Sequence, residues 1–157
     1  MRAMKNIATV AAAVVIAFGA GFGTAHLAAA PAAAASAPLT PQALDLGALT
    51  LDALPAVGPG NPLHAKGLMA QDGMTLGVQI GVVPKHYHAD ANEVQYVVDG
   101  TGTEWLGDKQ VALKPGMLLI IPKGTTHGGS TETNGSHLKL IAIKTPPQAP
   151  DDTHLVP

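Results

Sequence analysis

The chain of 157 residues has no cysteine, one arginine and only five aromatic side chains. Without cysteine no disulfide can link distant segments, so the folded state must be stabilised mainly by its hydrophobic core. Arginine supplies the planar fork that binds phosphate or carboxylate with two hydrogen bonds, and its scarcity argues against a strongly anionic substrate, although lysine can still serve. The net charge of −2 and the few rings also argue against nucleic acid as a partner.

Residues 1–35 have the layout of a secretory signal peptide. Arg2 and Lys5 precede an uncharged apolar run, and Ala-x-Ala cleavage options follow, with a cut before Ser36 favoured. We therefore expect an exported protein, periplasmic or extracellular, with no stable membrane span after processing. The alternative is an uncleaved N-terminal anchor that holds the chain in the membrane, facing the periplasm. Removal of residues 1–35 leaves seven lysines against 11 acidic residues, a net charge of −4.

Three further regions are expected after the leader. Residues 36–62 form a linker or N-terminal arm rich in proline, alanine and leucine; proline forbids a long helix there, and an edge strand or a short helix stays open. Residues 63–145 form the folded domain, and residues 146–157 form a Pro-rich tail, extended or frayed.

The sequence of this domain shows patterns typical of short β-strands, separated by turn signals such as Asp72-Gly73 and Asn134-Gly135. No helical period appears, so the pattern predicts an all-β sandwich, barrel or jelly roll. The predicted strands cover residues 63–70, 74–83, 85–88, 92–98, 103–106, 110–113, 117–121, 127–131 and 137–144.

Four side chains are of the kinds that hold a transition metal. His86 and His88 are one residue apart, so on a strand they point to the same face. Glu93 on the next strand and His127 on a later one can complete a single site. Imidazole nitrogens with one carboxylate suit Fe, Mn, Ni, Cu or Zn better than Ca or Mg. By the same alternation Gln95 faces inward with Glu93, and it needs a partner, which can be a ligand, a metal-bound water or a substrate.

These residues lie within two spaced blocks, fifteen residues apart. The first block is Gly81, His86-x-His88, Glu93 and Gly100, and the second is Gly116, Pro122-x-Gly124 and His127. The blocks closely resemble the two signature motifs of the cupin superfamily. Four residues rather than the usual five separate Gly81 from His86, and Thr131 stands where the family usually has asparagine, but neither departure touches a ligand position.

The resemblance implies a single antiparallel jelly-roll (cupin) β-barrel with one divalent transition metal (Fe, Mn, Ni, Cu or Zn) in its mouth. The metal ligands carried over from it are His86, His88, Glu93 and His127. It further implies a small-molecule metalloenzyme with dioxygenase-like oxidoreductase chemistry or isomerase or lyase chemistry. Glu93 and Gln95 are the candidate catalytic residues. The alternative is an exported module that binds a metal or small molecule without turnover.

Other residues have less specific expected roles. We expect Glu104, Lys85 and Lys123 to be solvated. A mostly apolar wall is expected around the site, from Val82, Val97, Leu119, Ile121 and Ile141. Because cupins commonly dimerise through sheet edges and N-terminal arms, a homodimer is also possible.

Overall fold

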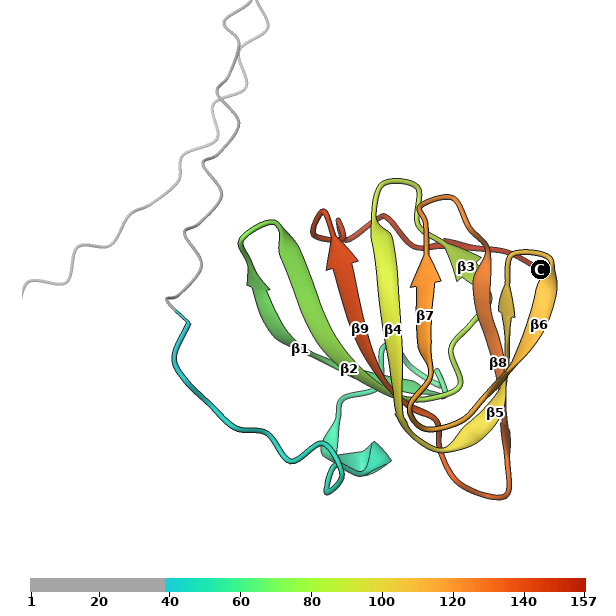
Figure 1. Ribbon diagram of the computed structural model, residues 1–157, viewed down its shortest axis with the longest axis horizontal. Coiled ribbons are helices and arrows are strands. Elements are labelled where there is room, and N and C mark those ends of the chain that lie inside the picture. Colours follow the sequence, from blue (N-terminus) through green and yellow to red (C-terminus); the bar gives the residue numbers. More distant parts are fainter. Residues whose placement is uncertain (1–38) are drawn as a thin grey trace, which may run out of the picture. The chain divides into compact units, whose positions relative to one another are not determined.

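The computed structural model describes residues 39–157, so the signal peptide expected at residues 1–35 lies outside the described residues. The described part contains one short 3₁₀ helix, η1 (Leu51–Ala53), and ten strands (Figure 1). The strands are β1 (Leu63–Gln71), β2 (Met74–Gly81), β3 (His86–Tyr87), β4 (Asn92–Asp99), β5 (Thr101–Leu106), β6 (Lys109–Leu113), β7 (Leu118–Ile121), β8 (His127–Thr133), β9 (Lys139–Thr145) and β10 (His154–Leu155). The expected all-β class is confirmed, and β10 is the one strand that the sequence pattern missed.

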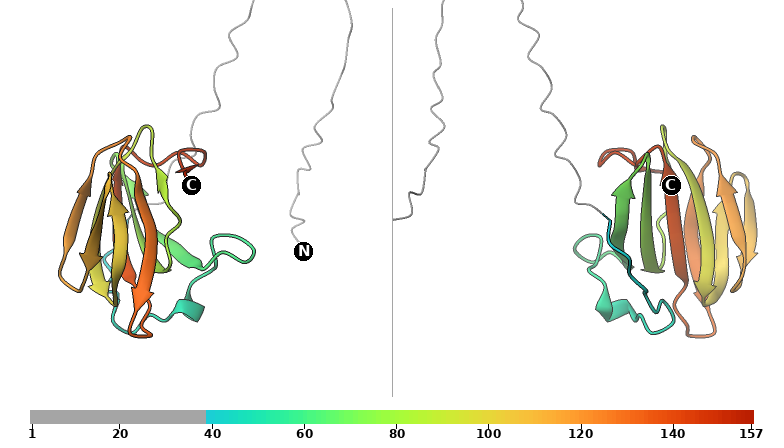
Figure 2. Two further views of the ribbon diagram at one scale, coloured as in Figure 1. Left: turned by 90° about the vertical axis from the view of Figure 1, so that its right-hand side faces the viewer. Right: turned by 60° about the vertical axis from the view of Figure 1, so that its left-hand side comes forward.

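The strands form two five-stranded antiparallel sheets that face each other (Figure 2). The first sheet has the order β1-β2-β9-β4-β7 and the second has the order β10-β3-β8-β5-β6. Strands distant in sequence are therefore neighbours, as when β9 lies between β2 and β4. This crossing of the chain between two sheets is the jelly-roll barrel that was expected.

The core of the barrel is built from the inward positions of alternating strands. On β4 and β7 every second residue is buried, and their Val97, Leu119 and Ile121 form one cluster with Leu140 of β9. Val83 and Leu138 join it from the connecting segments. Because side chains alternate between the two faces of a strand, the same register turns Glu93 and Gln95 into the barrel.

Two glycines of the motifs occupy turns that other residues rarely adopt. Gly100 has φ +82°, and a Cβ atom there would overlap the carbonyl oxygen of His137. Gly116 has φ +90° and ends the turn before β7. Glycine is the residue that takes such positive φ values without steric cost, which explains its presence at both turns.

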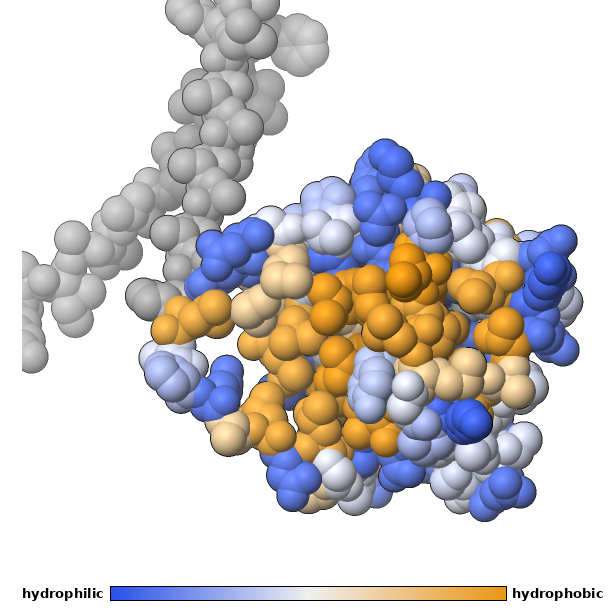
Figure 3. All heavy atoms as spheres, in the orientation of Figure 1, coloured by the Kyte–Doolittle hydropathy of each residue, from blue (hydrophilic) through white to orange (hydrophobic). Residues whose placement is uncertain are grey.

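The arm before β1 lies against the outer face of the first sheet. Leu54 is buried there with Val78 and Ile80 of β2, and η1 lies just before it in sequence. Farther along this face, Tyr96, Leu118 and Ile120 are exposed, and Figure 3 shows apolar side chains gathered over this region. No helix in residues 39–157 has the length and apolar character needed to cross a membrane.

Candidate metal centre

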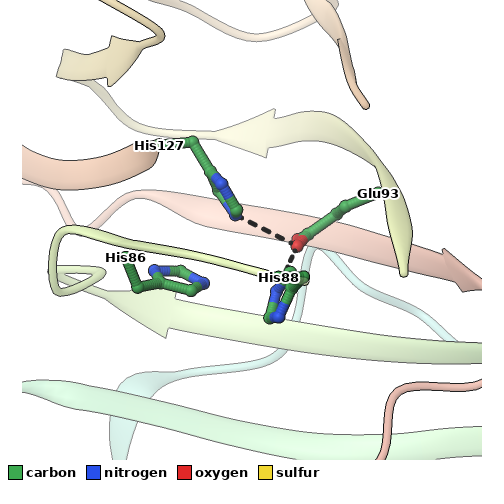
Figure 4. Close-up of side chains that lie close together, drawn as sticks. All are labelled: His86, His88, Glu93 and His127. Carbon is green, nitrogen blue, oxygen red and sulfur yellow. Dashed lines mark hydrogen bonds and ion pairs between the residues drawn. The ribbon is translucent and has the colours of Figure 1, made fainter. Parts of the chain in front are cut away.

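The four predicted ligands converge at one end of the barrel (Figure 4). The antiparallel pairing of β3 with β8 sets His86 opposite His127, and Glu93 lies near the start of β4. One ligand atom from each of the four side chains lies within 4.8 Å of the other three. The exposed fractions of the residues are 7% for His86 and 2% or less for the others, so the group is screened from bulk water.

Each histidine ring is oriented by a hydrogen bond on its far nitrogen. The Nδ1 atom of His86 donates to the carbonyl oxygen of Pro84 at 2.7 Å, and that of His127 donates to Thr125 at 2.9 Å. The Nδ1 atom of His88 donates to the carbonyl oxygen of Asp152. A carbonyl oxygen can only accept, so all three Nδ1 atoms carry the proton and each neutral ring keeps its lone pair on Nε2.

This tautomer is the one that binds a metal through Nε2. The Nε2 atoms of His88 and His127 lie 3.0 Å and 3.2 Å from Oε2 of Glu93. Lone pairs and a carboxylate oxygen at such distances repel one another unless a positive charge, a proton or a metal ion, joins them. The donor set therefore fits a divalent transition metal, and the hydrogen bonds on the three Nδ1 atoms orient the rings as such sites need.

The protonation states of His86 and Glu93 also favour the binding of a cation. Burial lowers the pKa of His86 to about 4, and the neighbouring His127 lowers it further toward that value. Burial alone would raise the pKa of Glu93, but the adjacent imidazoles of His127 and His88 and the charge of Lys144 outweigh it and hold that pKa far below its ordinary range. At neutral pH, His86 is a neutral donor and Glu93 is a carboxylate, which are the forms that ligate metals.

Gln95 is fully buried and contacts a predicted ligand directly. Its Nε2 atom donates to Oε1 of Glu93 at 3.0 Å, which leaves Oε2 of Glu93 for the histidines. The structure thus supplies a partner for the amide nitrogen of Gln95, whereas its buried Oε1 atom has no hydrogen-bond partner among the described residues. The catalytic roles of Glu93 and Gln95 stay predictions.

Glu104 is not the solvated strand residue that was expected. Its side chain on β5 is fully buried, and neither of its carboxyl oxygens has a hydrogen-bond partner among the described residues. Burial, with the negative charge of Glu93, raises the pKa of Glu104 to about 8. The sequence pattern failed here because one register step, with Gly102 and Glu104 inward, decides whether the residue faces water or the barrel.

The C-terminal tail is part of the site and is not frayed. In Figure 1 the tail, in dark red, crosses the end of the barrel where the loop between β3 and β4 lies. The buried carboxylate of Asp152 accepts hydrogen bonds from the backbone N–H groups of Ala89, Asp90 and Ala91. Beyond it, β10 pairs with β3. The tail therefore holds both the ring of His88 and the loop that leads to Glu93.

Lys144 is a further charged residue at the site that sequence reasoning missed. Its Nζ atom lies 3.7 Å from Oε2 of Glu93, and its side chain is 12% exposed. The signal was present, because Leu140, Ala142 and Lys144 alternate toward the interior of a strand that had been predicted. By the same alternation Ile141 faces outward, against the cluster under the arm, so its expected place in the wall of the site is wrong.

Comparisons with known proteins agree with this architecture. A family model described as a Cupin domain matches residues 74–144. No curated protein matches the chain.

Similar solved structures come from several bacteria. One is a conserved protein with a double-stranded beta-helix domain from Klebsiella pneumoniae, with 14% identity over 62% of this chain and 88% of that chain, and a TM-score of 0.52. KdgF from Halomonas sp. has 21% identity over 63% of this chain and 88% of that chain, with a TM-score of 0.52. A Streptomyces PAC13 variant with uridine has 15% identity over 69% of this chain and 88% of that chain, with a TM-score of 0.52. At such identities the likeness shows the fold alone.

The match to the family model falls on the strands that carry the four candidate ligands, and the solved structures share the barrel that brings them together. Residues 74–144 therefore form a Cupin domain, and the similar solved structures have the same fold.

Proposed function

We propose that this chain is a metal-dependent enzyme that acts on a small molecule by dioxygenase-like, isomerase or lyase chemistry. One observation carries the proposal: three Nε2 atoms, each fixed by a hydrogen bond on the opposite nitrogen, converge with one carboxylate oxygen. Ligands oriented in this way before a metal arrives are typical of a built metal centre rather than of a chance polar cluster.

His86, His88, Glu93 and His127 would hold one divalent ion of Fe, Mn, Ni, Cu or Zn. Such an ion would act as a Lewis acid toward a carbonyl or enolate oxygen, or as a redox centre where the metal allows it. Glu93 is the carboxylate placed to accept a proton from a substrate in the mouth. Gln95 holds Oε1 of that carboxylate and so controls how Glu93 turns.

The test begins with elemental analysis of the mature protein purified from its natural compartment without added metal. We expect near-stoichiometric metal in the wild type and its loss in His86→Ala, with wild-type content kept in His64→Ala, a variant of a histidine outside the site. Dioxygen uptake and product formation are then screened over small oxygen-rich substrates. Absence of metal from the wild type, even after reconstitution, would contradict the proposal.

The second candidate is a module that binds a metal or small molecule without turnover. The burial of all four ligands favours it, because a screened site exchanges its contents slowly. Metal or ligand affinity without product formation across the substrate panel would support this candidate against the enzyme.

We also propose that the protein is exported to the periplasm or the exterior, on the strength of the leader-like residues 1–35. Cell fractionation with mass spectrometry of the mature N-terminus tests this. A mature chain in the periplasm or medium supports it. An intact leader in the membrane fraction supports the anchored alternative, and an intact leader in the cytoplasm would contradict both.

A further inference from the structure

A cavity of about 440 Å³ opens beside His86, and a second of about 520 Å³ adjoins it along the inner face of β1, β2 and β9. The two share Ala65, Gln79, Lys144 and Gln148 as lining residues. The space exists because the inward positions here are small, as at Ala65, Gly67, Gly77 and Ala142. In the neighbouring core cluster, leucine, isoleucine and valine fill the interior instead.

Lys144 brings a positive charge into this space. Its Nζ atom donates to Oε1 of Gln148 at 2.5 Å, and its 3.7 Å distance to Oε2 of Glu93 is an ion pair rather than a hydrogen bond. An ammonium group has three donors, and within residues 39–157 it makes this one hydrogen bond. Lys144 therefore has donor capacity left for a ligand in the cavity.

Gln79 supplies an acceptor in the same space. Its Oε1 atom is buried and makes no hydrogen bond to any described residue. A buried acceptor left without a donor destabilises the fold, so such atoms are normally satisfied by water or by a ligand. Because Gln79 lines both cavities, a hydroxyl group of a bound molecule can satisfy it.

The carboxylate of Glu93 neutralises the charge of Lys144 only while it is not bound to a metal ion. Three neutral imidazoles and one carboxylate leave a divalent ion with an excess positive charge, to which Lys144 adds its own. A loaded site therefore attracts an anion to the cavity more strongly than the empty one. Lys66 also lines the larger cavity but is exposed, so Lys144 is the largely buried ammonium group there. One such lysine without arginine suits one carboxylate rather than a polyanion.

We propose that this cavity binds a small hydroxy-acid substrate, with its carboxylate on Nζ of Lys144 and a hydroxyl group donating to Oε1 of Gln79. This inference rests on the proposed function and names the substrate class of that same site. The scarcity of arginine likewise argues against strongly anionic substrates. The cavity narrows the substrate class to monocarboxylates that carry hydroxyl groups.

The proposal is tested by isothermal titration calorimetry on the full mature protein loaded with Zn²⁺, which permits binding without redox turnover. The probes are gluconate and 2-hydroxybutyrate, each compared with its uncharged amide. We expect each acid to bind at least tenfold more tightly than its amide, and the acids to lose at least tenfold in Lys144→Met. Gln79→Met should weaken the binding of both the acids and the amides.

Lys123→Met is the matched control, because Lys123 is an exposed lysine near the same end of the barrel. It should change the affinity for either acid by less than twofold. Metal content and circular dichroism, measured on every sample, establish that the variants are folded and loaded.

Equal binding of acid and amide by metal-loaded wild type, no binding of either acid, or unchanged affinity in Lys144→Met would overturn the carboxylate pocket and leave the metal centre standing. Failure of the wild type to take up metal would overturn the proposed function, and this inference with it.

Discussion

At the residue scale, the hydrogen bond on each Nδ1 atom sets the tautomer of the ligand histidines. Each Nδ1 atom donates to a backbone carbonyl, at Pro84, Thr125 or Asp152, and backbone positions are not changed by ordinary substitution. The tautomer of each ring is therefore a property of the folded chain. A metal arriving at the site meets three Nε2 lone pairs already turned toward it, and little side-chain entropy remains to be lost.

Glu104 gives a residue-scale prediction about pH. Its pKa is about 8 in the folded state against an ordinary value of 4.5, so the folded protein holds the proton more tightly than the unfolded chain. The stability contributed by the neutral acid is complete below pH 4.5 and is lost as pH rises toward 8. Glu104→Gln keeps a neutral side chain of the same shape at every pH. We therefore expect its unfolding free energy, relative to wild type, to rise with pH by about 1 kcal/mol per unit across this window.

Urea unfolding from pH 5 to pH 8 measures this difference. Asp108→Asn, a change in an exposed turn, serves as the control and should run parallel to wild type. If the unfolding free energies of Glu104→Gln and wild type change with pH in the same way, the raised pKa of Glu104 is contradicted.

At the scale of elements, the alternation of side chains along the neighbouring strands β4 and β9 brings the residues of the site together. Glu93 on β4 pairs with Lys144 on β9, and Gln95 pairs with Ala142, so all four face the interior. The carboxylate, its amide partner and the amine thus come from one stretch of sheet. A shift of register by one residue would turn every one of them outward.

The tail segment gives an element-scale prediction. Asp152→Ala removes the acceptor for three backbone N–H groups in the loop between His88 and Glu93. The loop and the ring of His88 then lose their common support, and we expect metal affinity to fall about 10- to 100-fold, as when other groups that orient a metal ligand are removed. Competition with a chromogenic chelator measures this affinity.

Asp151→Ala is the matched control for this change, because Asp151 is the exposed neighbour in the same tail. It should bind metal as wild type does. Equal affinity in the two variants would mean that the tail does not support the ligands.

At the scale of the whole molecule, the metal should contribute to folding stability. The chain has no disulfide, and a ligand that binds only the folded state stabilises it by about 2.7 kcal/mol at a free concentration of 100 times Kd. We expect chelation to lower the Tm of the loaded protein by roughly 10 °C, measured by differential scanning calorimetry. His86→Ala should show no change with chelator, and an equal decrease in both proteins would indicate that the chelator acts elsewhere.

We also propose that two copies associate through the outer face of the first sheet. Tyr96, Leu118 and Ile120 are 44%, 59% and 69% exposed on β4 and β7, and β7 is the edge strand of that sheet. The arm covers the other end of this face, so the uncovered apolar part adjoins a free edge, where a second copy offers matching apolar chemistry.

Ile120→Lys tests this association. A charge in the centre of an apolar contact should convert the dimer to a monomer in light scattering. Thr131→Lys, an exposed change on the opposite sheet, should leave the mass unchanged. A monomeric mass for the wild type would contradict the proposal.

The sequence by itself determined the all-β class, nine of the ten strands and the four candidate ligands, because alternation, turn glycines and ligand spacing are local properties of the chain. It did not reveal the buried state of Glu104, the approach of Lys144 to Glu93 or the support that Asp152 gives to His88. These depend on which strands become neighbours and on where the tail returns, since Asp152 lies 64 positions after His88 in the chain. Only the tertiary structure decides such contacts, because burial and charge pairing are set by residues that are near in space and far apart in the chain.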